Sequence, residues 1–86
     1  MPMTLDKQAL IEKLCALAGE QVGVDGSDLT ESTHLFNDLG YDSLDQMEFA
    51  MTVEEEYDVD IPDEAANDVK TVRDAYEALM KELAKR

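Results

Sequence analysis

Apolar positions along this chain recur at helical spacing. After Thr4, which can cap a helix N-terminus, apolar residues follow the i, i+3, i+4, i+7 rule. This pattern predicts a first helix that ends where Gly19 and Gly23 interrupt it. The apolar face of this helix consists of Leu10, Ile11, Leu14, Leu17 and Ala18.

The same spacing predicts three further helices. The second runs from about residue 43 to 57. Ile61-Pro62-Asp63 then offers a cap for a short third helix through about residue 67. Thr71, with Asp74 three residues later, matches a capping box and opens the last helix. The apolar residues of this last helix are Val72, Ala75, Tyr76, Leu79, Met80 and Leu83.

Residues 23–41 are rich in Gly, Ser, Asp and Asn, so they predict a long ordered loop. Four apolar residues are expected to hold this loop against the core: Leu29, Leu35, Phe36 and Leu39. No segment alternates as a strand would. The chain is therefore predicted to be all-α, a small four-helix bundle with a long first loop and a short third helix, in a single domain spanning residues 1–86.

Charge is distributed unevenly along the chain, whose formal net charge is −14. Between Lys13 and Lys70 every charged residue is acidic. Nucleic acid is disfavoured as a partner because phosphate contacts need clustered Lys or Arg. Proteins with basic surfaces are favoured instead, because long-range attraction steers them toward an acidic surface.

The remaining composition points to a soluble, cytoplasmic monomer. The N-terminus lacks the features of a signal peptide, and no stretch approaches the roughly 18 apolar residues of a membrane span. One cysteine, Cys15, excludes an internal disulfide and lies in an apolar pattern that predicts burial. No metal-ligand spacing is present, and His34 is expected on the surface of the loop.

The second helix has two apolar sides. One side is the predicted core stripe of Phe49, Ala50, Val53 and Tyr57. The opposite side carries Leu44, Met47 and Met51, interleaved with Glu48, Glu54 and Glu55. A methionine stripe is more often core than contact surface. Here the glutamate neighbours favour a deformable surface that docks basic partners.

The start of that helix suggests a chemical role for Ser43. Asp42 is as good a cap as Ser43, so the serine can occupy the first turn with its hydroxyl free. The N–H groups and macrodipole of a first helical turn favour an anionic group. We therefore interpret Ser43 as an attachment point for a phosphate.

The segment from Leu39 to Asp45, followed by Glu54–Tyr57 and by Ile61-Pro62-Asp63, resembles acyl carrier proteins of the fatty-acid and polyketide type. The resemblance covers about Leu5 to Leu83. It implies that Ser43 carries 4'-phosphopantetheine, transferred from coenzyme A by a separate phosphopantetheinyl transferase, and that acyl groups are held as thioesters on its thiol. The chain itself would have no catalytic residues.

The resemblance also assigns roles to neighbouring residues. Asp42 would fix the helix start, and Leu44 would contact partners beside the arm. The expected docking surface for basic acyl-transfer and condensing enzymes is Leu44, Met47, Glu48, Met51, Glu54 and Glu55. The family shelters its acyl chain among the helices, and the candidate pocket residues, each equally expected as plain core, are Leu35, Phe36, Met47, Ala50, Val53, Ile61 and Ala66. Many family members have a smaller residue than Tyr41 before the Asp, so its ring is expected to cover the attachment site partly or to contact partners.

Three alternatives belong to other classes. A serine enzyme would need a base, but the one histidine lies nine residues upstream of Ser43 and no Gly-x-Ser-x-Gly elbow is present. An acidic helical adaptor that senses calcium would need an EF-hand loop, whose spacing is absent. An aminoacyl or peptidyl carrier would share the fold and the arm, but Asp42 and the acidic second helix favour acyl cargo.

Overall fold

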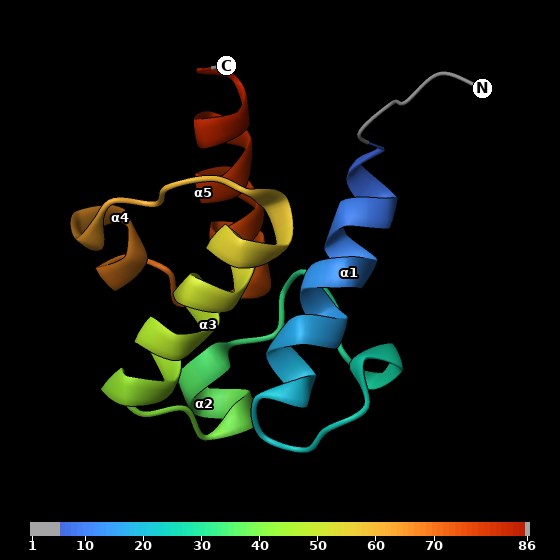
Figure 1. Cartoon of the computed structure of the whole chain (residues 1–86). Coiled ribbons are helices and arrows are strands. Elements are labelled where there is room, and N and C mark those ends of the chain that lie inside the picture. Colours follow the sequence, from blue (N-terminus) through green and yellow to red (C-terminus); the bar gives the residue numbers. More distant parts are fainter. Residues whose placement is uncertain (1–5, 86) are drawn as a thin grey trace.

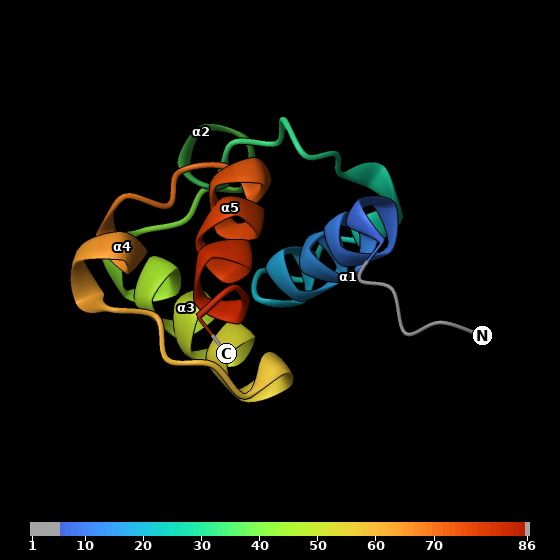
Figure 2. The same cartoon turned by 90° about the horizontal axis from the view of Figure 1, so that it is seen from above.

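The computed structural model describes residues 6–85, which fold into five α-helices and one 3-10 turn. These elements are α1 (Lys7–Glu20), η1 (Gly26–Asp28), α2 (Leu35–Leu39), α3 (Ser43–Tyr57), α4 (Asp63–Asn67) and α5 (Val72–Leu83). Helix α1 packs on α3 and α5, η1 packs on α1, and α4 joins α3 to α5 (Figures 1 and 2). The prediction of a small all-α bundle is confirmed.

The described part of α1 begins at a side-chain cap. Asp6 accepts a hydrogen bond from the backbone N–H of Gln8, while the predicted cap Thr4 lies outside the described residues. The helix continues through Gly19, where a Cβ would collide with the carbonyl oxygen of Val24. It ends at residue 20, and Gly23 then adopts a φ of +75°. Both glycines therefore shape the turn that closes α1.

The prediction that residues 23–41 form only a loop was wrong, because the segment contains η1 and α2. Polar side chains there cap short helices: Asp25 accepts from the N–H of Ser27, and His34 Nδ1 accepts from that of Asn37. Gly40 ends α2 with a φ of 74°. His34, expected on the surface of the loop, is partly exposed and caps α2, and its backbone pairs with that of Thr71 at the start of α5.

Two helices of the bundle, α3 and α5, begin with a capping box. In α3 the side chain of Asp42 accepts from the Asp45 N–H, and Asp45 accepts from the Asp42 N–H. In α5 Thr71 and Asp74 exchange the same pair of bonds. Helix α4 starts after Pro62 without a side-chain cap hydrogen bond.

The core lies where α1, α3 and α5 meet, and its largest fully buried side chains are Phe49, Leu14, Leu35, Leu79, Val53 and Val72. Cys15 is buried and unpaired, as the sequence predicted, and burial raises the pKa of its thiol. Within residues 6–85 no helix has the length and apolar character needed to cross a membrane.

Candidate functional site

Ser43 is the first residue of α3 and is exposed to solvent. The cap is supplied by Asp42, whose Oδ1 accepts from the Asp45 N–H at 2.9 Å, as the sequence predicted. Asp45 Oδ2 in turn accepts from the Asp42 N–H at 3.1 Å. Within the described chain, no hydrogen bond involves the Ser43 hydroxyl. The side chain is therefore accessible to a reacting group.

The first turn of α3 also retains open donors. The Asp45 N–H is used by the cap, and the Gln46 N–H donates to the Asp42 carbonyl at 3.0 Å. The backbone N–H groups of Ser43 and Leu44 have no acceptor among residues 6–85. With the positive end of the helix dipole, two open N–H groups beside an exposed hydroxyl suit an attached phosphate. The residues present thus fit a phosphate-linked prosthetic group.

Tyr41 lies in the core, and the prediction that its ring covers the attachment site or contacts partners was wrong. The residue is only 4% exposed, and its hydroxyl donates to the Ala18 carbonyl at 2.7 Å. Its ring meets Phe49 edge-on, with 6.1 Å between centroids. Burial, with a smaller contribution from the Asp45 carboxylate, raises the pKa of the Tyr41 phenol. The sequence feature that could have indicated this burial is a large aromatic residue directly after a turn glycine. A buried tyrosine needs a polar partner for its hydroxyl.

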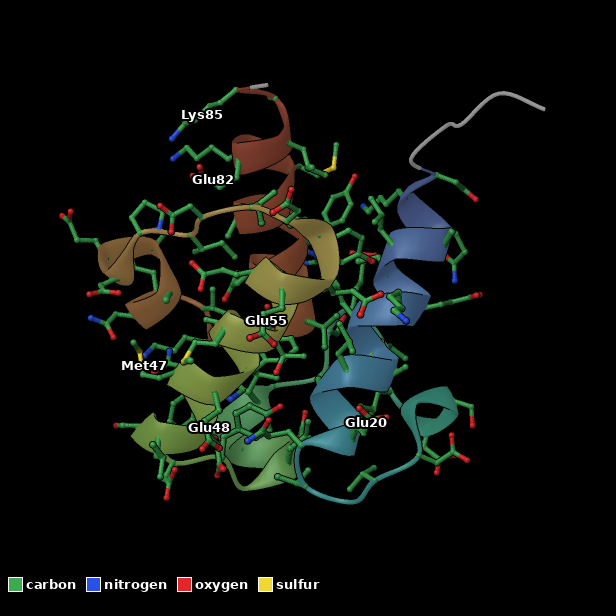
Figure 3. All side chains as sticks on the ribbon, in the orientation of Figure 1. Glu20, Met47, Glu48, Glu55, Glu82 and Lys85 are labelled. Carbon is green, nitrogen blue, oxygen red and sulfur yellow. The ribbon has the colours of Figure 1, made fainter. Side chains whose placement is uncertain are left out.

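The outer face of α3 exposes apolar side chains. Leu44 is 66% exposed and Met51 is 56% exposed, whereas Phe49 and Val53 on the other side of the helix are each 1% exposed. The two-sided character predicted for this helix is therefore present in the structure. Met47 is half-buried, and Figure 3 shows it with Glu48 and Glu55 along α3.

Two of the glutamates expected to dock partners also hold the fold together. Glu48 Oε1 accepts from Gln21 Nε2 at 2.6 Å, which links α3 to the end of α1. Glu54 Oε2 accepts from the Ile61 N–H at 2.7 Å, which ties α3 to the segment leading into α4. The Gln21–Glu48 contact joins residues 27 apart in the sequence, so no local pattern could have indicated it.

A small apolar cavity of about 10 Å³ lies between α3, the segments on either side of α4, and α5. Its lining residues are Gln46, Phe49, Ala50, Val53, Ile61, Val69, Ala75 and Ala78. Three predicted pocket residues, Ala50, Val53 and Ile61, belong to this lining, and the other four lie outside it: Leu35, Phe36, Met47 and Ala66. The volume is near the minimum that holds one water molecule, so the cavity is too small for an acyl chain as it stands.

Gln46 is a buried residue of this region that sequence reasoning missed. It is 5% exposed, and its Nε2 donates to the carbonyl oxygens of Asn67 at 3.0 Å and Val69 at 2.8 Å. The amide thereby ties α3 to the chain that follows α4. A glutamine in a helix is usually exposed, and only the carbonyls brought near it by the fold make its burial favourable.

Taken together, the fold and the site define a class: a small acidic helical carrier whose exposed serine opens one helix. Comparison with known proteins leads to the same class. The sequence profile described as a phosphopantetheine attachment site matches residues 12–79. The chain is 39% identical to an acyl carrier protein of Prochlorococcus marinus over 71 residues, covering 83% of this chain and 89% of that protein. It is 36% identical to an acyl carrier protein of Guillardia theta over 80 residues, covering 93% and 99%.

Solved structures agree with these relatives. The crystal structure of an acyl carrier protein from Thermotoga maritima has 28% sequence identity and a TM-score of 0.79, covering 98% of each chain. The solution structure of an apo doublet acyl carrier protein from prodigiosin biosynthesis has 26% identity and a TM-score of 0.74, covering 86% of this chain and 36% of that one. The chain belongs to the acyl carrier protein family.

Membership confirms the family and the prosthetic group that the sequence indicated. The protein is a carrier of acyl groups that depends on covalently attached 4'-phosphopantetheine. As in the family at large, it works with biosynthetic enzymes and a phosphopantetheinyl transferase. Within residues 6–85 no group of three or more His, Cys, Asp or Glu side chains is arranged to hold a metal ion.

Proposed function

We propose that Ser43 is the attachment residue and that the protein shuttles acyl thioesters between enzymes of fatty-acid or polyketide-type biosynthesis. The observation that carries this proposal is the geometry of the α3 start. Asp42 supplies the cap, which leaves the Ser43 hydroxyl exposed beside two open backbone N–H groups. The phosphodiester that links serine to the arm is anionic, and this turn is where an anion is favoured.

The chemistry at Ser43 is a phosphoryl transfer. The Ser43 Oγ attacks the phosphorus that bears the pantetheine arm of coenzyme A and loses its proton to a base of the transferase. The phosphoanhydride bond of coenzyme A breaks, and adenosine 3',5'-bisphosphate is the leaving group. Asp42 and Asp45 keep the first turn of α3 formed throughout. Once attached, the arm supplies a thiol that holds acyl groups as reactive thioesters.

The chain is a non-catalytic carrier in this proposal. His34, the single histidine of the sequence, is engaged as the cap of α2 through Nδ1 at 3.0 Å from the Asn37 nitrogen. Because its Nδ1 is used in that cap, and because the charged residues around Ser43 are all acidic, we assign the base of the reaction to the transferase.

The docking surface in this proposal is the outer face of α3, consisting of Leu44, Met47, Glu48, Met51, Glu54 and Glu55. The exposure of Leu44 and Met51 supports it, because side chains of this size are otherwise largely covered in the described chain. The absence of basic residues between Lys13 and Lys70 supports partners with basic surfaces. We place this monomeric, single-domain carrier in the cytoplasm.

An acyl chain would be sheltered where α3 faces the segment before α4, at the cavity lined by Ala50, Val53 and Ile61. The cavity holds only about 10 Å³, so an acyl chain can enter only if α4 and its flanking segments move away from α3. The ties that would loosen are the hydrogen bonds from Gln46 to Val69 and from Ile61 to Glu54.

Intact mass spectrometry tests the attachment residue directly. Incubation of the unmodified protein with coenzyme A, magnesium and a broad-range phosphopantetheinyl transferase should add one arm of about 340 Da, a modification carried by a serine hydroxyl. Ser43→Ala should gain no mass. Ser32→Ala, which removes another exposed serine, is the matched control and should be modified fully. Modification of Ser43→Ala would overturn the assignment.

A further inference from the structure

Tyr41 connects the attachment site to three helices. Its backbone N–H donates to the Leu35 carbonyl of α2 at 3.1 Å. Its hydroxyl donates to the Ala18 carbonyl of α1 at 2.7 Å, and its ring packs edge-on against Phe49 of α3. Asp42 and Ser43 are exposed, and the hydrogen bonds of Asp42 stay within the first turn of α3, whereas the contacts of Tyr41 reach α1 and α2 as well.

The Ala18 carbonyl has a particular need for this donor. The last carbonyls of a helix lack intrahelical partners, and Ala18 is in the last turn of α1 and fully buried. The next carbonyl, that of Gly19, accepts from the N–H groups of Val22 and Val24 at 3.0 and 2.8 Å. The carbonyl of Ala18 accepts from the Tyr41 hydroxyl instead. Without that hydroxyl, a buried acceptor would lose its donor, which is costly.

The tether between this anchor and the reacting hydroxyl is one residue long. Asp42 alone separates Tyr41 from Ser43, and its extended backbone, with φ −109° and ψ −175°, leads directly into the helix. On the other side Gly40 is fixed as the left-handed end of α2. A displacement of Tyr41 therefore moves the first turn of α3, because the capping box of α3 fixes only the shape of that turn and not its position relative to α1.

We propose that Tyr41 is a positioning residue for phosphopantetheine attachment: its hydrogen bond to α1 fixes the direction in which the Ser43 hydroxyl faces the transferase. The inference rests on the proposed role of Ser43. In this proposal the hydroxyl of a core tyrosine affects the attachment reaction, in addition to the packing of its ring.

The test is Tyr41→Phe, which removes the hydroxyl and keeps the ring against Phe49. A misdirected nucleophile lowers the maximal rate of the transferase reaction. We expect kcat to fall about tenfold, because small misplacements of reacting groups have effects of this order or larger. The KM for coenzyme A should not change. A second expected signature is added amide motion at residues 42–45, measured by NMR relaxation.

A purely structural role would give a different kinetic pattern. A partly unfolded carrier lowers the concentration of competent substrate, which raises the apparent KM for the carrier and leaves kcat at saturation unchanged. Val72→Ala, a core change in α5, provides this comparison. Tyr76→Phe, in a half-buried tyrosine of α5, is the matched control for loss of a phenol hydroxyl and should match the wild type.

The outcomes separate this inference from the proposed function. If the wild type accepts the arm at Ser43 and Tyr41→Phe retains the wild-type kcat, the positioning role is overturned and the attachment residue stands. The positioning role is also overturned if Val72→Ala lowers kcat as much as Tyr41→Phe does. Modification of Ser43→Ala would overturn both proposals, because the positioned residue would then be the wrong one.

Discussion

Helices α3 and α5 begin with the same local device, yet their first turns are used in opposite ways. Each is opened by a capping box, Asp42 with Asp45 in one and Thr71 with Asp74 in the other. At α5 the next two N–H groups are taken by the preceding chain: Val72 donates to the Thr33 carbonyl at 3.1 Å, and Arg73 donates to that of Glu31 at 2.9 Å. At α3 the corresponding groups have no acceptor within residues 6–85.

The residues in the first helical position differ accordingly. Val72 is fully buried in the core, whereas Ser43 is exposed. A helix start that the fold has covered stabilises the bundle, and one left uncovered can accept an anion. A capping box in a sequence therefore predicts where a helix begins, and the tertiary surroundings decide whether that start is structural or functional.

The difference between the two helix starts is tested most strongly by truncating the first residue of each helix, Val72 and Ser43. Val72→Ala should lower the free energy of unfolding by about 2 kcal/mol, because buried methyl groups are lost and a cavity remains. Ser43→Ala should change it by less than about 0.5 kcal/mol, as exposed substitutions do, yet abolish phosphopantetheine transfer. Urea denaturation and intact mass would measure both effects. Comparable destabilisation by the two variants would contradict the difference in burial.

Removal of the two caps sharpens the comparison further. Asp42→Ala and Thr71→Ala should each lower stability by about 1 kcal/mol, because each cap satisfies an otherwise open N–H group. Only Asp42→Ala should also slow the transfer to Ser43, since it loosens the turn that presents the hydroxyl. Chemical denaturation and initial transfer rates give the two readouts. Equal slowing by Thr71→Ala would show that the rate follows overall stability and not the local cap.

The outer faces of the two helices can be compared by charge reversal. Glu55→Lys on α3 should reduce the association rate with a basic acyl-transfer enzyme about twofold to fivefold at low salt, as expected for one exposed ionic contact. The reduction should shrink as salt screens the charges. Glu77→Lys, an exposed glutamate of α5, is the matched control. Stopped-flow association in two salt concentrations decides, and equal effects of the two variants would argue against a docking surface confined to α3.

The smallest predicted effect concerns the ion pair beside the α5 start. Arg73 Nε donates to Glu31 Oε2 at 2.8 Å, and this hydrogen bond holds the pKa of the Glu31 carboxyl below its usual 4.5. Because the folded-state pKa is lowered, the stabilisation is present above the unfolded pKa and is lost as pH falls through the folded pKa. Arg73→Gln should return the Glu31 pKa toward 4.5 and leave stability almost unchanged at a pH below the folded-state pKa of Glu31. An NMR titration of Glu31 measures this, and an unshifted Glu31 in the wild type would contradict it.

Sequence reasoning went furthest where local chemistry decides the structure. The boundaries of α3, the capping box of Thr71 with Asp74 and the buried face of α5 all follow from spacing and capping. The bounds of α4 were also predicted, but the predicted cap at its start forms no side-chain hydrogen bond. It failed at residues 23–41, where α2 is only five residues long and is held by contacts from elsewhere. The Leu35 N–H, for example, donates to the Lys70 carbonyl at 2.8 Å, a partner from the start of α5.

The sequence by itself determined the helical pattern, the acidic centre of the chain and a serine placed one residue after an equally good cap. These are local properties, fixed by spacing, propensity and charge within one turn or one helix. The tertiary structure decided that Tyr41 and Gln46 are buried and that the α5 start is covered while the α3 start is open. Those outcomes depend on donors and acceptors brought together from distant segments, because a buried polar group is stable only beside a partner that the fold supplies.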